Sequence, residues 1–217
     1  MTMPTLIAKH RAKVLETAFK KSVNTLYQAY NLTKIELGID NIYQNIIINN
    51  NTNTNNYYDE FRTVFEKNLK VTKKYEKNSY PIYNYNGTKL IEDAGSDYPH
   101  ATKILADGSS YDMHFNGDGI RVCIHLFIDT NGPYKKPNKY GHDIFKFQIF
   151  KDNKLMPVAM TKLYTDEELE NESHPDLLGY PCSINSKQKS NGAGCAYYAM
   201  NNINPDDNTK KYWENLP

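Results

Sequence analysis

The stretch that decides the fold is Val14–Tyr30, VLETAFKKSVNTLYQAY. Apolar and small side chains recur there at i, i+3, i+4, i+7, i+11, i+14 and i+15, which is one stripe of a 3.6-residue period. The pattern predicts an amphipathic helix from Pro4 to about Leu37, with Gly38 as its stop. Such a helix is about 45 Å long, so its first half is expected to protrude. The stripe consists of Leu15, Ala18, Phe19, Ser22, Leu26, Ala29 and Tyr30.

A second amphipathic helix is predicted after the low-complexity stretch Asn49–Asn56, which is typical of a surface loop. Its apolar face carries Tyr58, Phe61, Phe65 and Leu69. Short runs of strand character follow, separated by Gly, Asn, Asp and Pro, with no helical segments between them, so we expect an antiparallel sheet. The predicted strands are Lys103–Ala106, Ser110–Phe115, Ile120–Ile128, Ile144–Phe150 and Leu155–Met160. The fold class is therefore α+β, with an N-terminal helix at 1–37 and a globular domain at 38–217.

The composition argues against a general binder of anionic polymers. The 217 residues carry a formal net charge of +1, so a basic footprint over the whole domain is absent. We predict no nucleic acid as a partner on this ground.

The three cysteines differ in their surroundings. Cys182 and Cys195 lie close together in a stretch rich in Gly, Ser and Asn, and the chain has no CxxC motif, so a zinc ribbon or finger is disfavoured. We predict a disulfide between them, which implies an oxidising compartment; the alternative is two free thiols in a cytosolic loop. Cys123 stands in an apolar run, where a buried free thiol is expected.

The densest polar constellation lies within FIDTNGPYKKPNKYGHDIFKF, Phe127–Phe147. The side-chain oxygens in it are of the kind that bind Ca²⁺, and an Asp-x-Asn-Gly turn can present such oxygens to one ion. They belong to Asp129, Asn131, Asn138 and Asp143. The bidentate Glu of an EF-hand is missing. The alternative is that the Asn and Asp residues form Asx-turns, while Gly supplies positive φ. The sequence leaves both interpretations open.

Catalysis is disfavoured, because no G-x-S-x-G, Walker or H-E-x-x-H motif is present. A thiol–imidazole pair could in principle form between Cys195 and His125, His142 or His174. However, their spacing in the sequence does not indicate that any of these histidines lies next to the cysteine. We therefore expect that the chain is not an enzyme. An extracytoplasmic, non-catalytic carbohydrate- or ligand-binding module is the stronger rival function, because five tyrosines cluster in a region rich in Gly, Asn and Pro, where aromatic faces could stack on sugars. These are Tyr80, Tyr83, Tyr85, Tyr98 and Tyr111. The alternative is that tyrosine suits half-exposed strand positions and loops in general.

Several segments, taken in order, resemble the type IV pilin and type II secretion pseudopilin family. TMPTLI followed by the basic amphipathic helix resembles the exit of the apolar helix in proteins with a prepilin-type cleavage segment. FRTVFEKNLKVTKK is similar to the second helix of that family, and ILADGSSYDM to the strand–turn–strand after it. The Asp-x-Asn-Gly segment and NGAGCAYYAM resemble its later loop and its C-terminal ending. The family's leader, its processing site and the glutamate that follows it have no counterpart here.

The resemblance implies a structural subunit of a type IV pilus, a type II secretion pseudopilus or a related filament. Its partners would be other pilin or pseudopilin subunits, and an apolar helix upstream would anchor the precursor in the inner membrane. The expected location is extracytoplasmic, in the cell envelope. Major pseudopilins bind Ca²⁺ in a loop of the sheet, so the resemblance also favours calcium as a cofactor.

Overall fold

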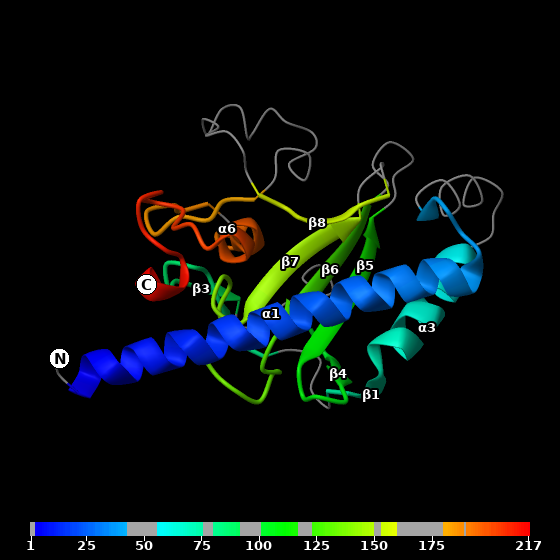
Figure 1. Cartoon of the computed structure of the whole chain (residues 1–217), viewed down its shortest axis with the longest axis horizontal. Helices are drawn as coiled ribbons and strands as arrows, with labels where there is room; N and C mark the ends of the chain where they lie inside the picture. Colours follow the sequence, from blue (N-terminus) through cyan, green and yellow to red (C-terminus); the bar gives the residue numbers. More distant parts are fainter. Residues whose placement is uncertain are drawn as a thin grey trace.

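The computed structural model describes residues 3–42, 56–75, 80–91, 101–116, 123–149, 153–159, 180–188 and 190–217. It confirms the α+β class, with a long N-terminal helix packed on an antiparallel sheet and a second, shorter helix beside it (Figure 1). Most of the predicted loop at Asn49–Asn56 lies outside the described residues.

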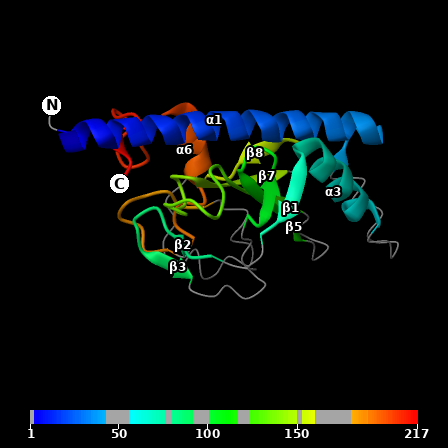
Figure 2. The same ribbon diagram turned by 90° about the horizontal axis from the view of Figure 1, so that it is seen from below.

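The first helix, α1, spans Met3–Leu37. Its buried stripe includes Phe19, Leu26 and Tyr30, as the periodicity predicts. Gly38 follows with a φ of 64°, a left-handed conformation that ends the helix without the cost a Cβ would add. Residues 6–11 are exposed, and the helix extends past the sheet at its N-terminal end (Figure 2). Among the described residues, no helix has the length and apolar character that crossing a membrane requires.

The main sheet is antiparallel throughout, in the order β1-β4-β5-β6-β7-β8. The central pairing places Tyr111 opposite Ile128, and Ile128 opposite Phe145. The strands are β1 Val71–Lys74, β4 Lys103–Leu105, β5 Ser110–Asn116, β6 Cys123–Asp129, β7 Ile144–Ile149 and β8 Leu155–Pro157. A separate antiparallel pair contains β2 Ile82–Tyr83 and β3 Lys89–Ile91. The predicted strands are confirmed to within a few residues, whereas β1, β2 and β3 had no counterpart in the sequence analysis.

The core lies between the sheet and the two helices α1 and α3, which spans Asn56–Leu69. Both helices cover one face of the sheet (Figures 1 and 2). Phe19 of α1 reaches Phe145 of β7 with ring centroids 4.3 Å apart, and Phe65 of α3 reaches Tyr111 of β5 at 5.9 Å. Aromatic pairs of this kind anchor the helices, because each ring buries a large apolar surface.

The C-terminal tail closes the core with two elements that the sequence analysis did not predict, α6 (Cys195–Asn201) and the 3₁₀ turn η1 (Trp213–Asn215). The Trp213 ring lies 5.4 Å from Phe19 and 6.1 Å from Phe145. The tail therefore fastens the middle of α1 to the sheet. Both elements are too short for a helical period to be visible in the sequence.

Candidate functional site

The predicted polar loop joins β6 to β7, and its two carboxylates stand at its ends. Asp129 is the last residue of β6, and Asp143 immediately precedes β7. Both side chains are fully buried, and the Thr130 N–H donates to the Asp143 carbonyl at 2.8 Å. The antiparallel ladder thus brings two carboxylates together that are fourteen positions apart in the sequence.

Asp129 caps the start of the loop. Its Oδ1 accepts the backbone N–H groups of Asn131 at 3.2 Å and Gly132 at 2.9 Å, which is an Asx-turn. Its Oδ2 accepts the Tyr80 hydroxyl at 3.2 Å. Tyr80 comes from a segment 49 residues earlier in the chain, and the sequence offered no signal that it belongs to this site.

Asp143 caps the end of the loop in the same way. Its Oδ2 accepts the N–H of Asn138 at 2.8 Å, and its Oδ1 accepts the N–H of Lys139 at 2.7 Å. Asn138 has a φ of 51°, a conformation that Asn tolerates better than most residues. The Asn131 amide donates to Asp143 Oδ2 at 3.1 Å, so Asn131 contacts both carboxylates. The structure therefore brings the four predicted residues into one network.

Burial disfavours the charged form of both carboxyl groups in this network. It raises the pKa of Asp129 well above its usual range, and the neighbouring Asp143 raises it further. Burial also raises the pKa of Asp143, to about 6, although the backbone N–H donors work in the opposite direction. Within the described part of the chain, no Lys or Arg forms an ion pair with either carboxylate. The pair therefore needs a proton or a cation to offset its charge.

Two neutral oxygens of the network are left without a hydrogen-bond partner among the described residues. They are the buried Oδ1 atoms of Asn131 and Asn138. Two carboxylates and two amide oxygens match the ligand chemistry of Ca²⁺, which takes six to eight oxygens. Each carboxylate oxygen already accepts a hydrogen bond but keeps further lone-pair capacity. No cluster of three or more His, Cys, Asp or Glu residues occurs in the described ranges, so a calcium site here depends on amide and backbone oxygens.

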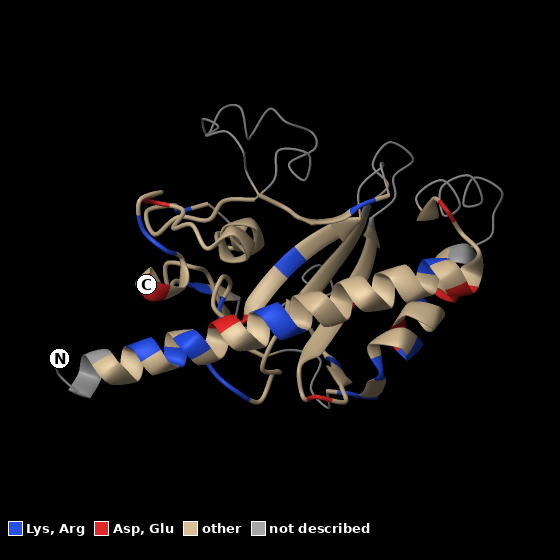
Figure 3. Cartoon of the chain, in the orientation of Figure 1, with Lys and Arg blue, Asp and Glu red and all other residues tan. Residues whose placement is uncertain are grey.

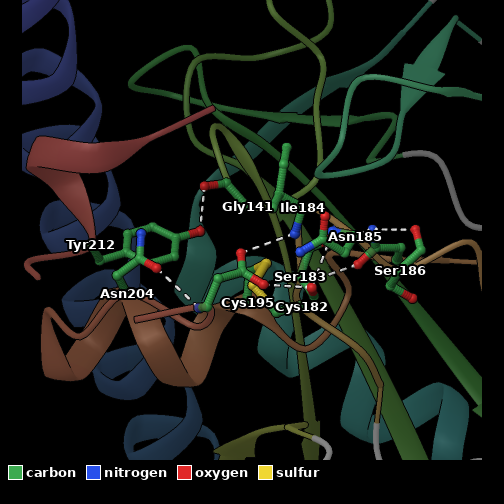
Figure 4. The surroundings of a disulfide bond; sticks show 11 residues. Gly141, Cys182, Ser183, Ile184, Asn185, Ser186, Cys195, Asn204 and Tyr212 are labelled. Carbon is green, nitrogen blue, oxygen red and sulfur yellow. Dashed lines mark hydrogen bonds between the residues drawn. A yellow bond between two sulfur atoms is a disulfide. The ribbon is translucent and has the colours of Figure 1, made fainter. Parts of the chain in front are cut away.

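A disulfide lies close to Gly141, near the end of this loop (Figure 4). Cys182 and Cys195 are joined, with Cα atoms 5.0 Å apart. The Tyr212 hydroxyl donates to the Gly141 carbonyl at 2.5 Å, which ties the C-terminal tail to the loop. The Cys123 side chain lies outside the described residues, so its expected burial remains a prediction. Because Cys195 is oxidised, the thiolate of a Cys–His pair is not present in this form.

Three of the five tyrosines that suggested a sugar-binding surface are buried in the fold. Tyr80, Tyr85 and Tyr111 are buried, Tyr83 is half-buried, and Tyr98 lies outside the described residues. The first three rings pack in the two hydrophobic clusters, so their faces are not accessible for stacking on a ligand.

No protein-family model matches this chain, and neither does any curated protein or solved structure. The structure therefore shows an α+β domain with three features. These are a protruding N-terminal helix, a polar loop capped by two carboxylates, and a C-terminal segment closed by a disulfide.

Proposed function

We propose that this chain is a structural subunit of a type IV pilus-like or type II secretion pseudopilus-like filament, which assembles through α1. The observation that carries the proposal is a set of large apolar side chains on α1 that are exposed to solvent. Ile7, Val14, Leu32 and Ile35 are 49%, 54%, 51% and 76% exposed. Residues of this kind are buried in a monomer where the fold allows it.

The spacing of these side chains favours a partner helix. Ile7, Val14 and Ile35 are separated by multiples of seven, and Leu32 lies one turn before Ile35, so a neighbouring helix running alongside meets them on one side. Lys21 interrupts the row, and its charge is paired with Asp107 at 2.9 Å. We refer to Ile7, Val14, Leu32 and Ile35 as the outer stripe.

One helix with two apolar faces suits a filament. The inner face binds the helix to its own sheet, and the outer stripe remains for other copies. A contact between unlike surfaces that does not close into a ring repeats as a helical array. The disulfide supports an extracytoplasmic location in the cell envelope, because such bonds persist in oxidising compartments. Anchoring in the inner membrane by an upstream apolar helix belongs to the same proposal.

Photo-crosslinking in cells that express the full-length protein tests this assembly. A photo-reactive amino acid at Val14 or at Leu32 is expected to give a ladder of multiples of the chain mass. At Thr63, which is exposed on α3, it is expected to give none, because no large apolar side chain is exposed among the α3 residues 58–69. Products that contain only other proteins, or equal ladders from Val14, Leu32 and Thr63, would refute assembly through the outer stripe.

We further propose that the β6–β7 loop holds one Ca²⁺ through Asp129, Asn131, Asn138 and Asp143. The support is the buried carboxylate pair, which forms no ion pair with a described Lys or Arg, together with the two amide oxygens that have no hydrogen-bond partner among the described residues. A divalent cation would offset both negative charges and supply the missing partner of each amide oxygen. Its effect would be to rigidify the loop, with no part in a reaction.

Calcium is expected to raise the Tm of the protein at pH 7.5 and to have little effect at pH 4.5. Without metal, the folded state keeps the Asp143 proton up to about pH 6. The unfolded chain loses it near 3.8, so the free energy of unfolding falls as pH rises through this window. Above it Asp143 is ionised and Ca²⁺ takes the place of its proton, which stabilises the fold by about 2.7 kcal/mol at a hundred times the dissociation constant.

Thermal melts with calcium or with EDTA measure this difference. Asp129→Ala should abolish the calcium-induced rise in Tm. Asp207→Ala should leave it intact, because Asp207 caps the Thr209 N–H in an exposed turn away from the loop. If neither calcium nor EDTA changes the wild-type melting curve at pH 7.5, the carboxylates act only as turn caps.

A further inference from the structure

Two short segments of mirrored sequence meet on the surface, one at the end of β1 and one in the β6–β7 loop. Lys73 and Lys74 are the last two residues of β1, and Tyr75 follows them. Tyr134, Lys135 and Lys136 are consecutive in the loop. The rings of Tyr75 and Tyr134 are in edge-to-face contact, with centroids 5.0 Å apart. Tyr134 is 62% exposed, and Tyr75 is half-buried, with its ring against Tyr80 at 5.8 Å. One tyrosine is thus anchored in the fold and holds the other at the surface.

Strand geometry decides which lysines share this surface. Lys74 is opposite Lys103, whose ammonium pairs with Glu66 of α3, so Lys74 belongs to the face of the sheet that the helices cover. Lys73 and Tyr75, each one position away, belong to the other face. β1 and the β6–β7 loop lie at the same end of the sheet in Figure 1, and Figure 3 shows basic residues on both. We define the basic–aromatic patch as Lys73, Tyr75, Tyr134, Lys135 and Lys136.

The lysines of the patch differ from many others in the fold. Lys73, Lys135 and Lys136 are exposed, and none has an ion-pair partner among the described residues. Elsewhere Lys20 pairs with Glu16 and Lys67 with Glu36. Three lysines that form no ion pair within the described part of the chain therefore surround one exposed ring, a local feature that the net charge of +1 conceals.

We propose that the basic–aromatic patch binds single-stranded nucleic acid. The exposed face of Tyr134 offers a platform on which one base stacks, and lysines on both sides of the tyrosine pair meet the phosphates that flank this base. A duplex fits less well, because its bases are already stacked on one another and no base face is free to stack on Tyr134. With only three lysines, the affinity is modest and strongly dependent on salt. This function is additional to filament assembly and uses a different surface from the outer stripe.

Fluorescence anisotropy with a labelled oligothymidylate of about ten nucleotides tests the proposal on the full chain. We expect the logarithm of the association constant to fall with the logarithm of salt concentration with a slope of about −2, at roughly 0.7 per phosphate contacted. Lys135→Ala and Lys136→Ala should each reduce that slope by roughly 0.7. Tyr134→Ala should weaken binding by about 5- to 100-fold, which is the usual contribution of a base–aromatic stack.

Two control variants match these changes in chemistry but not in position. Lys74→Ala removes a neighbouring lysine from the other face of the same strand, and Tyr197→Ala removes a tyrosine on α6 that is 45% exposed. Both should retain wild-type affinity, and melting curves should show every variant folded. The proposal is overturned if the oligonucleotide does not bind, or if the controls weaken binding as much as the patch variants do. It is equally overturned if a duplex or heparin binds as tightly and Tyr134→Ala has no effect, which would assign the patch to acidic polymers in general. None of these outcomes bears on the crosslinks through α1.

Discussion

Replacing Gly141 by alanine is expected to destabilise the protein by about 2–5 kcal/mol, as two independent costs add. Gly141 has a φ of 75°, which L side chains rarely adopt. A Cβ there would also lie 2.6 Å from Tyr85 Cδ2, 2.8 Å from the Tyr212 hydroxyl and 2.9 Å from Cys195 Sγ. All three neighbours are buried, so none of them yields easily. The Tm should fall by roughly 5–15 °C in a domain of this size.

The matched control is Gly87→Ala. Gly87 has a φ of 84°, but a Cβ there meets nothing within 4 Å, so only the backbone cost of about 1–2 kcal/mol remains. Denaturant unfolding of both variants separates the two costs. Equal losses at Gly141 and Gly87 would contradict the close packing of the loop against Tyr85, Tyr212 and the disulfide.

Removing the disulfide is expected to cost about 3 kcal/mol, because the cross-link restricts the unfolded chain across a short loop. Cys182 and Cys195 are 13 positions apart, and both are buried. The double variant Cys182→Ser, Cys195→Ser should therefore melt roughly 6–12 °C lower than the wild type. Its polar hydroxyls in a dry site increase the loss.

Reduction of the wild-type protein should reproduce most of this loss without any substitution. The double variant serves as the control, since it has no Cys182–Cys195 bond for the reductant to break and its melting curve should not change on reduction. Mass spectrometry of a non-reduced digest checks the pairing directly. A disulfide-linked peptide that contains Cys123 would contradict it.

Elements with a clear hydrophobic period were predictable from the sequence. The stripe through Phe19 and Leu26 located α1, and alternating runs located β4 to β8, because both patterns arise from local backbone geometry. The missed strands are short or polar: β1 is VTKK, and β2 and β3 have two and three residues. Such strands exist only because a neighbour supplies their hydrogen bonds, and the sequence does not identify that neighbour.

The candidate site likewise contains residues that the sequence identified and one contact that it did not. Asp129, Asn131, Asn138 and Asp143 were identified from their spacing, because Asx-turns and calcium loops both depend on residues close in sequence. The Tyr80 hydroxyl on Asp129 was not foreseen, since 49 residues separate the two. The burial that raises the pKa values of both carboxylates was equally hidden, because it depends on what packs around the loop.

By itself, the sequence determined the helices α1 and α3, the strands β4 to β8, and the Asp and Asn side chains that cap the β6–β7 loop. Only the tertiary structure decided that Tyr80, Tyr85 and Tyr111 are buried, and that Tyr75 and Tyr134 meet near lysines that form no ion pair with any described residue. The physical reason is that local preferences depend on neighbours along the chain. Burial, uncompensated charge and surface patches depend on which distant segments share a face of the sheet, and that is settled only when the whole core packs.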